Sequence, residues 1–516
     1  MTKTRSFWGW GYEEDALSAE ERAAVGLVVA DRLGGAELYP RPVPHVGELS
    51  LPAARVQPPA ALASLLTDGP LSRAAHAYGK AFRDVVRHLD GQYPHPPDLV
   101  AFPRDEADLE RLLAWCADAR VGAIPYGAGS SVVGGVEPAV PDGYSGTVSI
   151  DLGRMNAVIE LDETARAVRV QGGILGPALE DALRPHGLTL RHFPQSFEFS
   201  SVGGWIATRS GGHHSTLRTR IDQFVESVRM LTPSGVFETR RLPSSGAGPD
   251  PNSLVLGSEG TLGVVTEAWL RVQPRPDVRA RGSARFETFA AGVEAARRVA
   301  QSGLYPAECR LLDPLEAELN GAGQGEAVLL LGFEAAGLPA SVLEEQLRSA
   351  LALCGARTEV SAGAASSWRS SFLRAPYLRD ALALLGLVVE TFETAVTWDR
   401  FVVLHERVVA AAREVAPAAL VTCRFTHVYA DGPAPYFTVI APGRDGEQLR
   451  QWDAIKAACS DALSAAGGTI THHHAVGRDH RPWYGSEAPA LFLDALSAAK
   501  RELDPRGVMN PGALLP

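Results

Sequence analysis

The chain has 516 residues, of which 46% are hydrophobic, and its formal net charge at pH 7 is −11. This length is enough for about two or three domains with sizeable apolar cores. The negative charge and the lack of any basic tract exclude nucleic acid as the main partner. Lysine occurs only at positions 3, 80, 456 and 500. An anion bound by this protein is therefore expected to contact arginine side chains or backbone N–H groups.

No stretch has the pattern of a targeting signal or a membrane span. The start, MTKTRSFWGWGYEEDALSAEE, becomes acidic before an apolar run develops, and the final GALLP is not a peroxisomal signal. The longest apolar run, residues 381–389, is far shorter than the ~20 residues of a transmembrane helix. The five cysteines form no CxxC pair, which predicts reduced core residues and neither disulfides nor a zinc site. We expect a cytoplasmic protein and leave peripheral contact with a membrane open.

The predicted elements divide the chain into four regions and indicate an α+β fold. The first region is helix-like with proline-rich breaks, the second is rich in strands, the third alternates helices with strands, and the fourth is a C-terminal segment. Their expected bounds are 1–94, 95–275, 276–465 and 466–516. Within the second region, a strand at 98–103 precedes an amphipathic helix that carries Leu109, Leu112, Leu113 and Cys116 on one face.

A glycine-rich loop, PYGAGSSVVGG at residues 125–135, follows the next strand. Glycines let the backbone approach a ligand closely, and Ser130 and Ser131 add hydroxyl donors. The loop is not a Walker loop, because no GK[ST] follows. Nor is it a good Rossmann fingerprint, because Val132 replaces the third glycine. Taken alone, the stretch fits a plain structural turn as well as a ligand-binding loop.

Three further stretches favour ligand binding. Residues 194–212 concentrate glycines and hydroxyl groups, and residues 171–190 supply a helix and a turn. Residues 254–272 predict a buried strand, the sequence EGTLG and a second strand. Together with the glycine loop, they resemble the FAD-binding domain of the vanillyl-alcohol oxidase/PCMH flavoprotein superfamily. The resemblance implies a PCMH-type FAD-binding domain at 95–275, an α+β cap domain over the flavin, and helical segments at both ends.

The same resemblance implies which residues contact FAD. Backbone N–H groups packed along the glycine loop would neutralise the diphosphate. Because this loop contains neither Cys nor His, we expect non-covalent FAD. The expected cofactor-binding residues are Pro125, Tyr126, Gly127, Ala128, Gly129, Ser130, Ser131, Pro194, Gln195, Ser196, Phe197, Glu198, Phe199, Ser200, Thr208, Arg209, Ser210, Gly211, Glu259, Gly260, Thr261, Leu262, Gly263, Val264 and Val265.

A more specific resemblance covers essentially the whole chain. Five stretches are similar to the alkylglycerone phosphate synthases and their bacterial relatives: FWGWGYEE (7–14), LSRAAHAYGKAFRDVVR (71–87), PAECRLLD (306–313), YLRDALALLGLVVETFETAVTWDR (377–400) and CRFTHVYADGPAPYF (423–437). The family exchanges the acyl group of acyl-dihydroxyacetone phosphate for a fatty alcohol in ether-lipid synthesis, without net redox change. One departure is Arg478, which stands where the eukaryotic enzymes carry lysine.

This resemblance also implies roles for individual side chains. Tyr436 matches the catalytic tyrosine, Arg379 the residue that binds the substrate phosphate, and Arg310 an arginine important for activity. A surface salt bridge is the alternative for each arginine. A phenol with a pKa of ~10 is a poor base at pH 7, so a neighbouring imidazole should tune Tyr436.

Three consecutive histidines, His472, His473 and His474, supply candidate imidazoles. They lie in a short β-like run, which predicts that His472 and His474 share one face while His473 points away. A related branch, the FAD-linked 2-hydroxy acid dehydrogenases, has an EHG[IV]G motif here, and His473 replaces its Glu. Without that carboxylate we expect a catalytic cluster and no metal. A metal site and purely structural histidines are the alternatives.

Three functions compete on this basis. The first is an FAD-dependent alkylglycerone-phosphate synthase, the second an FAD-linked oxidase or dehydrogenase of an alcohol or 2-hydroxy acid, and the third a non-catalytic flavin-binding scaffold or sensor. The arginine expected to bind phosphate and the Glu-to-His exchange favour the first. We expect a lipid-like small-molecule substrate and a homodimer.

Overall fold

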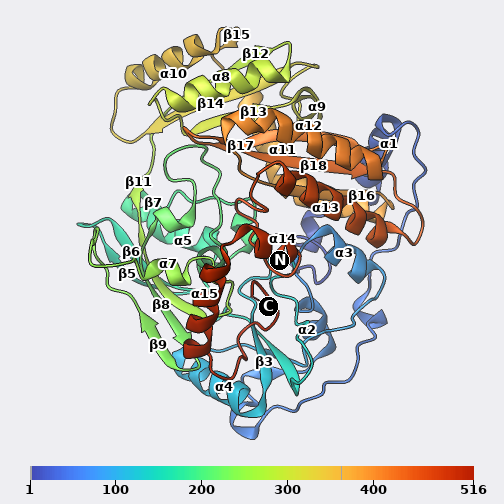
Figure 1. The fold of residues 1–516 in the computed structure, drawn as a ribbon, viewed down its shortest axis with the longest axis vertical. Helices are drawn as coiled ribbons and strands as arrows, with labels where there is room; N and C mark the ends of the chain where they lie inside the picture. The colour runs from blue at the N-terminus through green and yellow to red at the C-terminus, as the bar shows by residue number, and fades with distance from the viewer. Residues whose placement is uncertain (1–2, 362, 516) are drawn as a thin grey trace.

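Three β-sheets follow one another along the chain and organise the computed structural model, which describes residues 3–361 and 363–515 (Figure 1). The first sheet has the strand order β1 (Leu66–Thr67), β2 (Leu99–Ala101), β4 (Gly146–Ile150) and β3 (Val121–Pro125). β2, β4 and β3 are parallel, which requires the crossover helix α4 (Glu106–Ala119) between β2 and β3. Leu109, Leu112, Leu113 and Cys116 of α4 are buried, as predicted.

The second sheet is antiparallel. Its strand order is β5 (Val158–Asp162), β6 (Ala167–Gln171), β10 (Val264–Arg271), β8 (Val225–Thr232) and β9 (Gly235–Glu238). Its core also contains residues of α5 (Gly176–Leu183), α6 (Val202–Thr208) and α7 (Asn252–Val255). The strand predicted at the start of 254–272 is wrong, because Asn252–Val255 is helical and the chain then turns with positive φ at Gly257 and Glu259. A two-stranded sheet of β7 (Leu188–Thr189) and β11 (Gln273–Pro274) lies before the third sheet in sequence.

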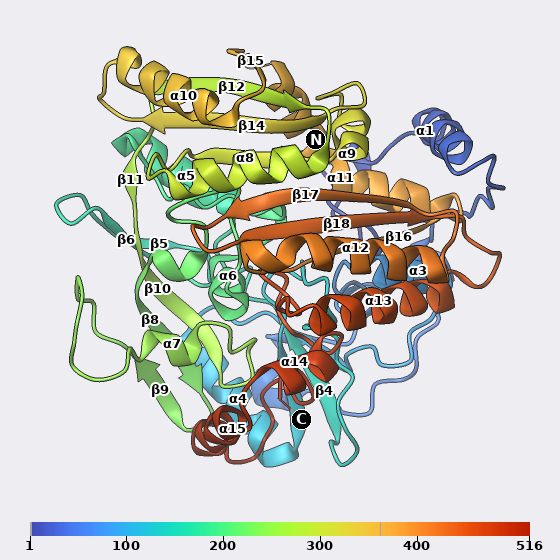
Figure 2. The same ribbon diagram turned by 45° about the horizontal axis from the view of Figure 1, so that its top comes forward.

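The third sheet has seven strands. Their order is β15 (Arg357–Glu359), β12 (Val278–Phe286), β14 (Ala327–Ala335), β13 (Glu308–Leu312), β17 (Leu420–Val428), β18 (Pro433–Ala441) and β16 (Val388–Glu393). Figure 2 shows α8 (Phe289–Gln301), α10 (Ala340–Cys354), α12 (Trp398–Val415) and α13 (Gln448–Ala465) packed along this sheet. The short α9 (Pro314–Leu319) and the long α11 (Gly363–Leu384) complete the region. The α+β fold predicted from the alternating pattern is therefore observed.

Side-chain alternation gives the seven-stranded sheet two different faces. Phe392, Phe425 and Phe437 belong to the buried apolar core that also includes α12 and α13. Phe425 packs against Phe401 of α12 at a centroid distance of 4.8 Å. Their neighbours in sequence, such as Arg424 and Tyr436, consequently lie on the opposite face. That face looks toward the first two sheets and is available for a site.

The N-terminal region contains α1 (Ala19–Arg32), α2 (Pro70–Ala75) and α3 (Phe82–Leu89). The stretch 71–87 thus contains most of α2 and α3, which are separated at 76–81. A Cβ at Gly79 would lie 2.1 Å from the carbonyl oxygen of Ser131, and the N–H of Lys80 donates to that carbonyl at 2.6 Å. The break allows the backbone to contact the glycine loop.

The C-terminal segment returns to the first two sheets through α14 (Arg481–Glu487) and α15 (Ala490–Leu503). The carbonyl of Val508 and the N–H of Asn510 bond the backbone of Ala123 in β3, each at 2.8 Å. Within the described residues, no helix is long and apolar enough to cross a membrane.

Gly477 joins this segment to the glycine loop and provides a first test. Its φ is +56°, and a Cβ there would lie 2.1 Å from the Val133 carbonyl oxygen. We expect Gly477→Ala to lower the free energy of unfolding by more than about 1 kcal/mol, because both the backbone conformation and the contact exclude a side chain. Chemical denaturation measures the change. Gly485→Ala is the control, since a Cβ at Gly485 in α14 would have no atom within 4 Å. Equal stability of the two variants would contradict the role of Gly477.

Candidate active site

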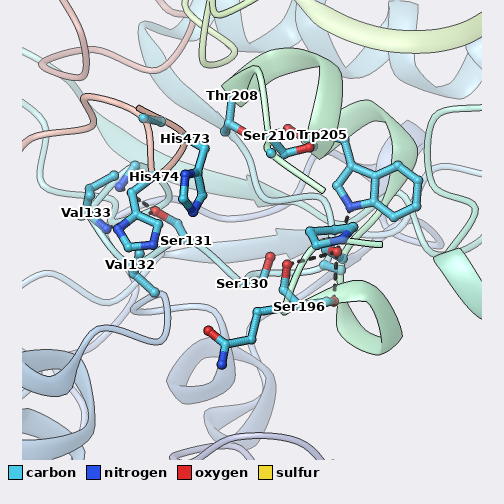
Figure 3. A pocket seen from close by; sticks show the side chains of 18 of the residues that line it. Ser130, Ser131, Val132, Val133, Ser196, Trp205, Thr208, Ser210, His473 and His474 are labelled. Atoms are coloured by element: carbon cyan, nitrogen blue, oxygen red, sulfur yellow. Dashed lines mark hydrogen bonds between the residues drawn. The ribbon is translucent and has the colours of Figure 1, made fainter. Parts of the chain in front are cut away.

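One large cavity, called the central cavity below, lies between the glycine loop, the loops of the second sheet, the His472–His474 segment and the seven-stranded sheet. Figure 3 shows Ser130, Ser131, Thr208, Ser210, His473 and His474 around it. The N-terminal stretch contributes Trp10, whose N–H donates to Asp380 at 2.6 Å. The cavity thus collects residues from segments that are far apart in the sequence.

The glycine loop has the properties required for binding a diphosphate. Gly127 and Gly129 have φ values of +60° and +72°, a conformation that favours glycine. Among the described residues, no acceptor bonds the N–H groups of Gly127, Ala128, Ser130 or Ser131. Free N–H groups on a curved backbone suit a diphosphate. The residues present therefore fit FAD. No cysteine lines the central cavity in the described chain.

Most of the residues expected to bind the cofactor line the central cavity. They are Pro125, Tyr126, Gly127, Ala128, Gly129, Ser130, Ser131, Pro194, Gln195, Ser196, Ser200, Thr208, Ser210, Gly211, Glu259, Gly260, Gly263, Val264 and Val265. The sequence patterns did not identify further lining residues, including Val132, Val133, Ser201 and Trp205. Several of these are adjacent to the quoted motifs, so extending each motif by a few residues would have found them.

Six of the expected cofactor-binding residues do not line the cavity, and for them cofactor binding stays a prediction. Phe197 packs beside Trp205, and Phe199 packs edge-on against Trp10. Glu198 is exposed, and Arg209 forms an ion pair with Asp222 at 3.0 Å. The Thr261 hydroxyl donates to the Ser258 carbonyl at 2.7 Å, and Leu262 is fully buried in the core of the second sheet. These six residues shape the loops that carry the lining groups.

The seven-stranded sheet provides the opposite wall. Arg310 on β13, Arg424 on β17 and Tyr436 on β18 line the central cavity, together with Arg379 on α11. Arg310 lies 3.8 Å above the Trp368 ring and donates to the His213 carbonyl at 2.9 Å. It is fully buried, so the surface salt bridge considered for it is wrong.

Arg379 is held in place by its neighbours. Its Nε and Nη2 donate to Asp380 Oδ1 at 3.0 and 2.7 Å, and its Nη1 donates to the Lys80 carbonyl. The salt bridge expected as an alternative is present, but it lies at the cavity wall and not on the open surface. Glu259 is the only acidic residue on the described wall, against Arg310, Arg379 and Arg424. The balance of charge favours an anionic ligand.

The same wall has an apolar part. Phe372, Leu378 and Leu382 of α11 line the central cavity, as do Val389 of β16 and Ile440 of β18. A ligand with an anionic end and a hydrocarbon end would match both parts.

The three histidines lie in an irregular loop, not in a strand. The carboxylate of Glu393, at the end of β16, accepts hydrogen bonds from the N–H groups of His472, His473 and His474 at 2.5, 3.1 and 2.8 Å. It also accepts one from the Thr471 hydroxyl at 2.6 Å. Three consecutive N–H groups reach one carboxylate only if the backbone curves around it, which a strand cannot do. The predicted alternation is therefore wrong.

Because the loop is curved, the three rings point in directions that differ from the predicted ones. His473 and His474 both line the central cavity, whereas His472 does not. The His472 ring lies behind them, with Nδ1 3.0 Å from Nδ1 of His473 and Nε2 2.7 Å from the Tyr429 hydroxyl. A fourth imidazole, His427 of β17, lies on the cavity wall at a centroid distance of 5.7 Å from His473.

Glu393 was not identified from the sequence. The sequence did contain a signal for it. Glu393 is a carboxylate at the end of the apolar run VVETFE, and it alternates with Val389 and Thr391, which line the cavity. His473 replaces the Glu of the EHG motif, but Glu393 places a carboxylate beside it from another part of the chain. Two sets of ligand-type atoms lie within 4.8 Å of one another, in His427, His472 and His473 and in Glu393, His473 and His474. The Glu393 oxygens, however, already accept four hydrogen bonds.

The environment sets the protonation of these groups. Burial lowers the pKa of His472 and His474 to about 3 and also lowers that of His473, so the imidazoles are neutral at pH 7. Burial alone would raise the pKa of Glu393, but the positive charge that a neighbouring imidazole would carry when protonated and the hydrogen bonds from the Thr471 hydroxyl and three backbone N–H groups favour the ionised acid and hold its pKa well below its usual value. The cluster therefore combines an ionised acid with neutral bases.

Tyr436 is buried beside this cluster. Burial raises its pKa, and Arg424, 3.9 Å from the ring centroid, opposes that rise. Arg424 donates to Glu316 at 2.7 Å. The Tyr436 ring centroid lies 5.6 Å from that of His474 and 6.4 Å from that of His473. The described chain shows no hydrogen bond from its hydroxyl to either imidazole. Tyr436 is thus a neutral phenol that lines the same cavity as His473 and His474, so one bound ligand can contact all three side chains.

Two parts of the chain match known protein families. Residues 97–240 match the family described as FAD binding domain, and residues 275–514 match FAD linked oxidases, C-terminal domain. The protein is a member of this group of FAD-linked enzymes, as the first resemblance implied.

Individual relatives include alkyldihydroxyacetonephosphate synthases, which agree with the second resemblance, and a glycolate oxidase subunit. The chain is 31% identical over 484 residues to an alkyldihydroxyacetonephosphate synthase of Dictyostelium discoideum, covering 87% of this chain and 78% of the relative. It is 28% identical to the glycolate oxidase subunit GlcD of Bacillus subtilis, and the match covers 82% of this chain and 90% of the relative. A solved alkyldihydroxyacetonephosphate synthase structure superposes with a TM-score of 0.81, at 26% identity and with 98% of both chains covered.

The role of Glu393 can be tested by substitution. In Glu393→Gln one acceptor oxygen becomes a donor facing backbone N–H groups, so the free energy of unfolding should fall by about 1–3 kcal/mol. Activity should fall more steeply, because His473 and His474 lose their positions. Since the folded-state pKa of Glu393 is depressed, its stabilisation is present above pH 4.5, the usual value, and decreases as the pH falls toward the folded-state value. Denaturation at several pH values measures this.

Glu487→Gln is the matched control for this prediction. Glu487 is exposed and accepts from the Ile470 N–H at 2.8 Å and the Thr469 hydroxyl at 2.6 Å, at the other end of the same loop. Water can replace these bonds, so the cost should be small. A native activity for Glu393→Gln would show that the carboxylate does not position the imidazoles.

Proposed function

The chain belongs to the alkyldihydroxyacetonephosphate synthase family, and on this premise we propose that it exchanges the acyl group of acyl-dihydroxyacetone phosphate for a fatty alcohol. The observation that supports this best is the shared cavity of Tyr436, His473, His474, Arg310 and Arg379. We assign FAD binding to residues 95–275 and substrate binding mainly to the cap region, 276–465. FAD, when bound, supplies covalent chemistry at its ring system without net electron transfer.

Each part of the substrate has a counterpart on the cavity wall. Arg379 binds the phosphate, because its guanidinium is already oriented by Asp380 and the Lys80 carbonyl. The apolar side chains of α11, β16 and β18 accommodate the acyl chain. Arg310, stacked on Trp368, adds positive charge on the same wall. Water is excluded from this end of the cavity by the hydrocarbon.

The proton chemistry follows from the protonation states. A neutral imidazole of His473 or His474 accepts a proton from the carbon next to the ketone. Tyr436 donates its hydroxyl proton to the oxygen of the departing acyl group, and it becomes a phenol again when the incoming alcohol loses its proton. Arg424 stabilises the phenolate that forms, because its charge lies over the Tyr436 ring. Glu393 keeps both imidazoles aimed into the cavity while it remains ionised.

The proposed exchange differs from an oxidation in a measurable way. The purified protein is mixed anaerobically with acyl-dihydroxyacetone phosphate and a fatty alcohol, and release of fatty acid and formation of the ether are measured. We expect exchange without oxygen uptake and without lasting bleaching of the flavin. Persistent bleaching by a hydroxy acid that reverses with oxygen, together with no exchange, would instead establish the FAD-linked oxidase.

The phosphate role of Arg379 gives a further prediction. Arg379→Lys should raise KM for phosphorylated substrates at least about tenfold, because an ammonium group cannot reproduce the planar fork. The flavin spectrum should not change. Arg374→Lys is the control, because Arg374 is exposed on the same helix. An unchanged KM in Arg379→Lys would exclude Arg379 as the phosphate ligand.

A further inference from the structure

A chain of hydrogen bonds leads away from the central cavity through His472. His473 lies on the cavity wall, its Nδ1 is 3.0 Å from His472 Nδ1, and His472 Nε2 is 2.7 Å from the Tyr429 hydroxyl. That hydroxyl also lies 3.0 Å from Thr219 Oγ1. His472 is buried, and both of its ring nitrogens are therefore engaged in this chain.

Tyr429, the residue at the far end of the chain, also lines a second cavity, called the outer cavity below. Tyr429 lines it together with Thr397, Asp431, Trp483, Ser486 and Glu487. Asp431, Ser486 and Glu487 are exposed, so the outer cavity opens to solvent. Tyr429 itself is half-buried and separates this solvent from His472, which lines neither cavity.

We propose that His472 and Tyr429 form a proton relay between His473 in the central cavity and the solvent of the outer cavity. The geometry supports it, because both steps lie within the range of about 2.6–3.2 Å over which a proton is transferred.

The relay moves one proton and changes no other bond. When His473 takes a proton at Nε2, its Nδ1 proton passes to Nδ1 of His472. The Nε2 proton of His472 then passes to the Tyr429 oxygen, and the hydroxyl proton of Tyr429 leaves to water in the outer cavity. His473, His472 and Tyr429 each gain one proton and lose one, so the net change is that one proton leaves the central cavity and enters the water of the outer cavity. The reverse sequence returns a proton to the central cavity.

The need for such a path rests on the proposed function. Exchange of an acyl group for an alcohol forms an ether C–O bond and breaks an ester C–O bond. It releases a carboxylate at neutral pH, so the alcohol proton must leave the site at each turnover. The acyl chain and the flavin, when bound, would occupy the central cavity, and a second exit for the proton would avoid that obstruction.

Tyr429→Phe in the FAD-loaded protein tests the relay, because it removes one hydroxyl and retains the ring. In weak buffer we expect kcat for alkyl exchange to fall on the order of tenfold, with KM and flavin content unchanged. Added imidazole, a small proton carrier, should restore the rate with saturation. His472→Ala should be rescued in the same way. Tyr305→Phe, at an exposed tyrosine that lines neither cavity, should behave as the wild type.

Two results would overturn the relay while leaving the proposed function intact. One is a native rate for Tyr429→Phe in weak buffer. The other is a lower rate that imidazole does not restore, which would show that Tyr429 only holds His472 in place. If the wild type shows no alkyl exchange, the proposed function fails instead. The same comparison then uses oxidation of a hydroxy acid, which also transfers a proton, so the relay is still tested.

Discussion

The ionised carboxylate of Glu393 is the constraint on which the active-site geometry depends. It is fully buried, and its desolvation is offset by hydrogen bonds from three backbone N–H groups and one hydroxyl group. A charge buried in this way cannot move without exposing unsatisfied donors. It therefore fixes a loop that has no regular secondary structure, and the loop in turn fixes three rings in different directions.

This constraint also connects the two halves of the protein. Glu393 ends a strand of the seven-stranded sheet, whereas the loop that it holds precedes Gly477, which packs on the glycine loop. Glu259 makes a parallel connection, since it accepts from the N–H groups of Val476 and Gly477 at 2.8 and 2.6 Å. Glu393 from the cap sheet and Glu259 from the FAD-binding region thus both accept hydrogen bonds from the backbone of residues 472–477. The imidazoles are consequently positioned relative to the flavin loops and to the cap sheet at once.

Local patterns in the sequence were sufficient for much of the fold. The apolar face of 106–119, the strand before the glycine loop and the alternating cap region each depend on neighbouring residues only, and each is observed. The prediction for the histidines, which depended on a remote contact, failed. Their loop curves because the carboxylate of Glu393, far earlier in the chain, accepts hydrogen bonds from three consecutive N–H groups. The cavity residues came mostly from resemblance, and Glu393, Arg424 and Tyr429 were missed because their importance lies in three-dimensional pairs.

The same contacts bear on whether the cluster holds a metal ion. Ligands must present free lone pairs, and a carboxylate that already accepts four hydrogen bonds would have to give up several of them to bind a cation. His427 likewise has Nε2 2.9 Å from the Gly212 carbonyl, so that nitrogen carries a proton and is not a ligand. The donors surround the carboxylate, and the neutral rings point into the cavity or toward one another. Such an arrangement suits the movement of protons, which requires each ring to keep one nitrogen protonated and one free, better than it suits coordination of a metal.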